Sequence, residues 1–304
     1  MRKSIKILSI LGLGFFLLGN KAATAQTDST FNYTDSIVKW TVPCGVNSVT
    51  ITAIGATGGI FIGYTPVGGN GAKMVGTFAV TSGSVLKILV GQAGQSGSGG
   101  GGGGGGTFVT DALNNPLIVA GGGGGVSAQN NTFTSIGIDA VTTNNGVNGN
   151  SALGSNPANY GVGGTGGSGA TNSGPGGPCA GNGGGLLTNG TAYSCCSLTT
   201  WGYAFVNGGA GGIDGGCFAN GQGGFGGGGS GGYTGGGGGG GYSGGGGSWD
   251  QPTNGGGGGS YNGGTSQTNT AAFNASGNGQ VIIQYTASSN LAVSGNVISN
   301  VSCN

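Results

Sequence analysis

Apolar and polar side chains alternate along several short segments of the chain, as expected of β-strands that bury one face. Val49, Ile51 and Ala53 share one face of the clearest segment, and threonines take the other face. The spacing of an amphipathic helix does not occur after residue 25, so the pattern predicts an all-β protein built on an antiparallel sandwich. The segments predicted as strands are 31–34, 37–42, 49–53, 78–80, 86–90, 107–110, 116–120 and 280–285.

A glycine-rich stretch, 96–265, separates most of these strands from the last one. Glycine and serine tracts commonly behave as flexible linkers, but this stretch also holds four cysteines and many aromatic residues, eight of them between 201 and 249. The ordered alternative is a bundle of polyglycine-II helices, which have about three residues per turn and direct their backbone N–H and C=O groups outward. Because glycine loses much backbone freedom on ordering, such runs need anchors at their ends. The uninterrupted runs are 99–106, 121–125, 226–229, 235–241, 244–247 and 255–259.

These patterns divide the chain into successive parts. Residues 26–95 form the first part of the sandwich, and 96–265 form the polyglycine-II bundle, which contains the hairpin 107–120. Residues 266–286 form the closing strand of the sandwich. The Thr-, Ser- and Asn-rich residues 287–304 are either a terminal tail or the start of a truncated further module.

Residues 1–25 have the features of a secretory signal peptide. Basic residues precede an apolar stretch at 5–18, and Ala23-Thr24-Ala25 forms a small-x-small cleavage site. An apolar stretch of this length is shorter than the roughly 20 residues that cross a bilayer. We therefore expect a secreted, extracellular protein, free or associated with the cell surface, with no transmembrane segment in the mature chain.

The mature chain has very few groups that titrate. It retains three lysines and six aspartates, a net charge of −3, and it contains no histidine, glutamate or arginine. General acid–base catalysis most often uses histidine, or glutamate and lysine with altered pKa values, so the composition predicts no enzyme and no cofactor. Nucleic-acid binding needs a basic patch to neutralise phosphates, and we expect none.

Several strand motifs and glycine runs occur in a fixed order along the chain. The order resembles the glycine-rich extracellular region of the anaplastic lymphoma kinase and leukocyte tyrosine kinase receptors, and of related secreted glycine-rich proteins. The resemblance covers about 31–286. The matching pieces are Trp40-Thr41-Val42-Pro43, 54–59, 88–92, 99–109, 116–121, Trp201-Gly202-Tyr203, 226–247 and Gly279-Gln280-Val281.

This resemblance implies a jelly-roll sandwich similar to tumour necrosis factor, with an inserted bundle of left-handed glycine helices that binds protein ligands. The membrane span and kinase motifs of the receptors have no counterpart here, so the resemblance is to the module alone. We expect a secreted, non-catalytic recognition or adhesion module whose partner is a protein or glycan at a surface. The alternative is a rigid structural spacer, or a cell-surface or matrix component, without a specific ligand.

Six cysteines in an exported protein indicate disulfides. Adjacent cysteines seldom pair with each other, so Cys195 and Cys196 are expected to reach separately to Cys179 and Cys217. The receptor resemblance implies that one of the adjacent pair joins Cys217. Cys44 and Cys303 form a less certain further pair.

Three aromatic residues in the glycine-rich stretch, Tyr233, Tyr242 and Trp249, are candidate contact residues, because aromatic side chains often anchor interfaces. The alternative is that they brace the ends of the bundle.

Overall fold

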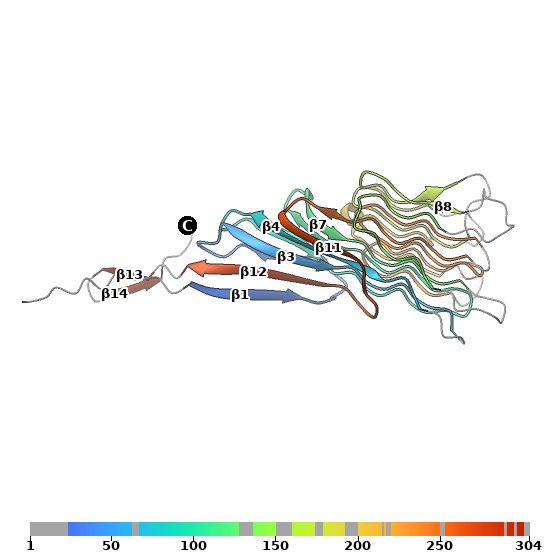
Figure 1. The fold of residues 1–304 in the computed structure, drawn as a ribbon, viewed down its shortest axis with the longest axis horizontal. Helices are drawn as coiled ribbons and strands as arrows, with labels where there is room; N and C mark the ends of the chain where they lie inside the picture. The colour runs from blue at the N-terminus through green and yellow to red at the C-terminus, as the bar shows by residue number, and fades with distance from the viewer. Residues whose placement is uncertain are drawn as a thin grey trace, which may run out of the picture.

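The fold is that of a computed structural model. It is all-β, with two five-stranded antiparallel sheets beside a glycine-rich bundle (Figure 1). This confirms the predicted fold class at the level of antiparallel sheets in an arrangement compatible with a sandwich. The structure describes residues 24–62, 67–127, 136–149, 160–173, 179–191, 200–214, 216, 220–249, 253–288, 291–294 and 297–300.

The first sheet has the strand order β1-β12-β3-β4-β11, and the second has the order β10-β7-β6-β5-β2. Each sheet joins strands from the two ends of the chain. The strands of the first sheet are β1 (Thr24–Phe31), β12 (Gln280–Ser288), β3 (Ser48–Ile54), β4 (Gly71–Ala79) and β11 (Thr265–Asn274). Those of the second are β10 (Tyr261–Asn262), β7 (Pro116–Ala120), β6 (Thr107–Asp111), β5 (Val85–Leu89) and β2 (Val38–Thr41).

The main hydrophobic core lies between the two sheets. Val49, Ile51 and Ala53 of β3 are almost fully buried, as the alternation predicts. They share a single cluster with side chains of both sheets, including Ile88 of β5 and Val281 of β12. The register that pairs Val281 with Ala53 and Ala53 with Met74 places these residues on one face of the first sheet.

The second sheet is also covered on its other face. Leu89, Phe108 and Val119 point away from the main core and pack in a second cluster with apolar side chains from the glycine-rich stretch. Phe205 begins a short 3-10 helix, Phe205–Asn207, and its ring stacks on Phe108 at 5.2 Å. Because both faces are buried, β6 is buried along nearly its whole length. This second cluster joins the bundle to the sheets.

Several details differ from the strand prediction. β4 begins at Gly71, although only 78–80 was predicted, and the two-residue strands β8, β9 and β10 were not predicted. The segment 31–34 is wrong as a strand, because the chain leaves β1 after Phe31 and turns at Asp35, which has a φ of 56°. The strand β11 was not predicted, since its mostly polar residues are exposed along the sheet edge. β1 begins at Thr24, so it includes the last two residues of the predicted signal peptide.

Two short pairs of strands complete the described structure. β8 (Gly161–Val162) pairs with β9 (Thr171–Asn172) inside the glycine-rich stretch. β13 (Leu291–Ser294) pairs with β14 (Val297–Asn300) within the predicted tail.

The glycine runs lie side by side and exchange backbone hydrogen bonds (Figure 1). In the run 99–106, the N–H groups of three successive glycines donate to carbonyl groups of three different segments. Every third N–H group donates to the same segment. All six N···O distances are 2.8–2.9 Å. The donor–acceptor pairs are Gly101 to Val126, Gly104 to Gly123, Gly102 to Gln95, Gly105 to Gln92, Gly103 to Gly229 and Gly106 to Gly226.

Neighbouring runs approach too closely for any side chain. A Cβ atom added to Gly103 would lie within 3 Å of the backbone of Gly238, and one added to Gly239 would lie within 3 Å of the backbone of Gly122. The glycines of the runs 99–106 and 235–241 are buried throughout. Glycine is therefore required in these runs because the packing leaves no room for a side chain.

Candidate recognition surface

The turns at the end of the bundle farthest from the sheets lie next to one another. Gly100 forms a bridge with Ser127, whose backbone N–H donates to Asn254 Oδ1 at 3.0 Å. Asn254 Nδ2 in turn donates to the Ile136 carbonyl at 2.8 Å. Gly235 packs against Gly100, so the turn 232–235 belongs to the same end. These contacts connect segments that are far apart in the sequence.

Large apolar side chains are exposed on these turns. Ile136 is 63% exposed, Ile62 57%, Val67 48% and Tyr233 45%. Val67 pairs with Ile136 in a parallel bridge, and the Ile62 N–H donates to the Gly97 carbonyl at 3.0 Å. Single exposed apolar residues are ordinary, whereas a group of them marks an interaction surface. We call Ile62, Val67, Ile136 and Tyr233 the distal surface.

Tyr233 has a left-handed backbone conformation, with a φ of 52°. It lies in a tight turn that is closed by reciprocal hydrogen bonds between Gly232 and Gly235, at 3.1 and 2.7 Å. A bulky residue rarely adopts this conformation, and such outliers cluster at functional sites. The turn therefore presents the tyrosine ring at the end of the bundle at some cost in stability.

The other two candidate contact aromatics lie in different surroundings. Tyr242 is partly buried in the second cluster, where its ring stacks on Tyr261 at 4.9 Å and 27°. It therefore braces the end of the bundle nearest the sheets. Trp249 is partly exposed. Trp249 follows Ser248, whose backbone lies against Gly235, so Trp249 is at the distal end together with Tyr233.

Sequence reasoning did not select Ile62, Val67 or Ile136. Each stands within a few residues of glycine and outside every segment predicted as a strand. Short apolar clusters next to glycine in a long connection, such as Ile60-Phe61-Ile62 and Ile136-Gly137-Ile138, are the signal that would have found them.

The predicted cysteine pairs fall mostly outside the described residues. Cys44 is exposed in the turn after β2, and Cys179 is 5% exposed at the start of a glycine segment. Neither is a free thiol. Cys195, Cys196, Cys217 and Cys303 lie outside the described residues, so the predicted pairing stays a prediction.

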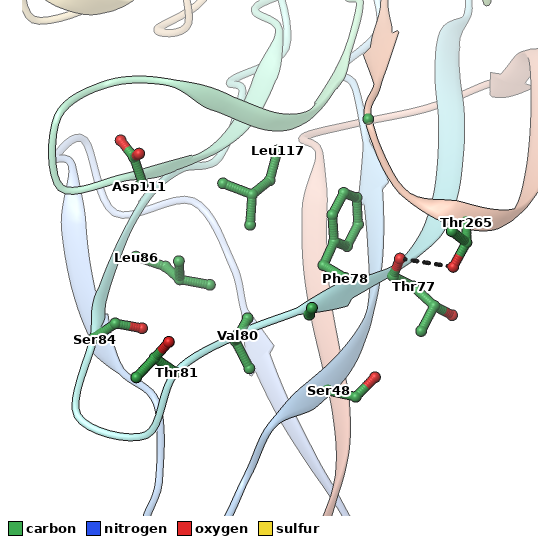
Figure 2. A pocket seen from close by; sticks show the side chains of 12 residues that line it. Ser48, Thr77, Phe78, Val80, Thr81, Ser84, Leu86, Asp111, Leu117 and Thr265 are labelled. Carbon is green, nitrogen blue, oxygen red and sulfur yellow. Dashed lines mark hydrogen bonds between the residues drawn. The ribbon is translucent and has the colours of Figure 1, made fainter.

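A cleft of about 690 Å³ opens between the two sheets (Figure 2). Phe78, Val80 and Leu117 form its apolar wall, and Asp111 is the charged residue at its rim. The Asp111 carboxylate accepts hydrogen bonds from the Leu113 N–H and from the backbone and side chain of Asn115, at 2.7–2.9 Å.

These hydrogen bonds affect the pKa of the Asp111 carboxyl group. Burial alone would raise the pKa of Asp111, but the hydrogen bonds from Asn115 and Leu113 and the charge of Lys87 outweigh burial and lower it. The carboxylate therefore stays ionised, and its oxygens already accept hydrogen bonds from residues of its own turn. It closes the β6–β7 hairpin and is poorly suited to take a proton from a ligand.

In the described ranges, no three His, Cys, Asp or Glu side chains lie close enough to hold a metal ion. No helix among the described residues is long and apolar enough to cross a membrane. No known protein-family model matches the chain, and no curated protein matches it significantly. The resemblance to the receptor glycine-rich region accordingly stays a prediction.

Proposed function

We propose that this protein is a secreted, non-catalytic recognition or adhesion module that contacts a protein or glycan through the distal surface. The observation that carries the proposal is the group of exposed apolar side chains at the end of the bundle, which includes a tyrosine in a strained turn. Aromatic side chains are frequent anchors of interfaces, and a group of exposed apolar side chains marks an interaction surface. The sheets act as the stable platform that holds the bundle.

The same proposal includes the finer architecture. The return of the acceptor segment at every third glycine is the behaviour expected of polyglycine-II helices, which have about three residues per turn. We propose that the runs are such helices and that the two sheets form a jelly-roll similar to that of the receptor module. Disulfides among the central cysteines would add further anchors to a region without a side-chain core.

The competing function is a rigid spacer without a specific ligand. The dense backbone hydrogen bonding of the buried runs supports it, since a stiff rod needs no exposed contact residues. The spacer function leaves the apolar side chains of the distal surface without a role. It also predicts that no partner binds saturably.

The test is a binding screen of the full chain against a glycan array and a panel of extracellular proteins, followed by variants. Tyr233→Asn keeps a residue that tolerates a positive φ, and Ile136→Ser removes an exposed apolar side chain. Each variant is expected to lower the affinity for a partner that binds saturably by about tenfold or more, which corresponds to about 1.4 kcal/mol of binding free energy. Thermal melts should show that both variants fold.

The matched control is Leu113→Ser. Leu113 is 81% exposed in the β6–β7 hairpin turn, at the end of the sandwich away from the bundle. Its substitution should leave binding unchanged. A blank screen, or a partner whose binding is weakened equally by the control, would exclude recognition through the distal surface and favour the spacer.

A further inference from the structure

A second pocket lies on the outer face of the first sheet, away from the distal surface. Its volume is about 380 Å³, and it is formed where the turn after β11 passes over the ends of β3 and β12. Gln280, Ile54 and Lys73 form one cross-strand row on this face, opposite the core row of Val281, Ala53 and Met74. The volume lies near the lower end of the range of about 300–1,000 Å³ found for ligand pockets.

The lining of this pocket is unusually rich in amides. It contains four amide side chains, two aromatic rings and no charged residue, and its lining residues are Asn32, Tyr33, Ile54, Phe273, Asn274, Asn278, Gly279 and Gln280. No charged side chain lines the pocket itself, and the ammonium group of Lys73 lies over the ring of Phe273 at its wall.

Internal hydrogen bonds use only part of the capacity of these amides. Gln280 Nε2 donates to Asn32 Oδ1 at 2.9 Å, and Asn278 Oδ1 accepts from the Ala93 N–H at 2.9 Å. Among the described residues, no hydrogen bond occupies the Nδ2 groups of Asn32 and Asn278 or the Oε1 atom of Gln280. The pocket therefore offers donors and an acceptor that are already fixed in orientation by their own partners.

Two aromatic side chains supply an apolar wall. The ring of Phe273 is 46% exposed, and Lys73 Nζ lies 4.7 Å from its centroid. Tyr33 is partly buried, and the centroid of its ring lies 6.2 Å from the ring centroid of Phe225. Burial, and then the neighbouring Asp35, raise the pKa of Tyr33, so its hydroxyl stays protonated and bonded to that carboxylate. A ligand thus meets aromatic carbon on one side and amides on the other.

We propose that this pocket binds a neutral pyranose sugar. A pyranose carries hydroxyl groups, each both a donor and an acceptor, and C–H faces that pack on aromatic rings. Its hydroxyls match the Nδ2 donors of Asn32 and Asn278 and the Oε1 acceptor of Gln280, and its C–H face packs on Phe273. An apolar ligand would leave these amides unpaired, which costs about 1–3 kcal/mol for each buried group.

The test follows the side-chain amides directly. Two-dimensional ¹H–¹⁵N NMR spectra of the labelled full chain are recorded while glucose, galactose, mannose and N-acetylglucosamine are added in turn. At least one sugar should shift the Asn32 and Asn278 NH₂ signals in a saturable way. Gln280→Leu and Phe273→Ala should each lower the affinity for that sugar by about tenfold. Neither should change the signals of the glycine bundle in the spectrum.

The control is Gln284→Leu, on the same strand and face but outside this pocket, where the Nε2 group reaches only Asp28 at 3.4 Å. It should leave sugar binding unchanged. Inorganic phosphate and N-acetylneuraminic acid serve as charged probes. The proposal is overturned if no neutral sugar gives saturable shifts, if a charged probe binds more tightly, or if the control loses binding to the same extent. None of these outcomes bears on the distal surface, whose residues lie elsewhere.

Discussion

A single methyl group inside the glycine bundle should destabilise the protein more than almost any surface change. Gly239 is buried, and a Cβ atom there would meet the carbonyl group of Gly122 and the carbonyl oxygen of Gly123. Both contacts are with backbone, so no side chain can rotate away. Its N–H donates to Gly256 at 2.9 Å, and its carbonyl accepts from Gly245 at 2.8 Å.

The expected magnitude for Gly239→Ala follows from these contacts. Overpacking costs about 1–3 kcal/mol, and loosening two hydrogen bonds costs about 1 kcal/mol each. The reduced freedom of the unfolded chain returns about 0.4–1 kcal/mol. The free energy of unfolding should therefore fall by about 2–5 kcal/mol.

The assay is urea denaturation followed by tryptophan fluorescence, together with hydrogen exchange of the glycine amides. Gly166→Ala is the matched control, because Gly166 has a φ of +59° and nothing lies within 4 Å of an added Cβ. The control carries only the backbone strain of about 1–2 kcal/mol. If Gly239→Ala were as stable as the wild-type protein, or no less stable than the control, the runs could not be packed as described.

Three further predictions concern the sheets. Phe205→Ala should lower the free energy of unfolding by about 3–5 kcal/mol, because the ring is buried against Phe108; Leu113→Ala, at an exposed site, should change it by less than about 0.5 kcal/mol in the same denaturation assay. The lowered pKa of Asp111 means that its contribution to stability is present above its unfolded value of 3.8 and is lost as the pH falls below it, so Asp111→Asn should flatten the acid limb of a plot of stability against pH. The raised pKa of Tyr33 means the opposite: its contribution is complete below the unfolded value of 10.0 and is lost as the pH rises past it, so Tyr33→Phe should flatten the alkaline limb.

β3 could be predicted from the sequence because it has one buried face, marked by apolar residues at every second position. The hairpin β6–β7 could be predicted from two short segments on either side of the turn 111–115, although they do not alternate in this way. β11 could not be found in this way, since an edge strand with exposed polar residues has no periodic signal. The burial of the second face of β6 could not be predicted either, because the residues that cover it come from the distant glycine-rich stretch. They are Leu186, Phe205 and Phe225.

The candidate site was only partly predictable for a related reason. Tyr233 and Tyr242 have the same sequence context, a tyrosine between glycine runs, yet one is exposed at the distal end and the other is stacked at the end nearest the sheets. A glycine run reverses direction at each turn, and the sequence does not say at which end a given turn falls. That depends on which runs are neighbours, which is decided by long-range hydrogen bonds.

The combination of a glycine bundle with two sheets suits a recognition protein for a physical reason. A run whose neighbours change at every residue is held on several sides by backbone alone, so its position is independent of side-chain chemistry. The side chains of Ile136 and Tyr233 are exposed and lie outside the buried runs, so they can be replaced without disturbing the packing at Gly103 or Gly239. Stability and surface chemistry are thus carried by different residues. An ordinary side-chain core would couple the two, because each replaced contact residue would alter the packing beneath it.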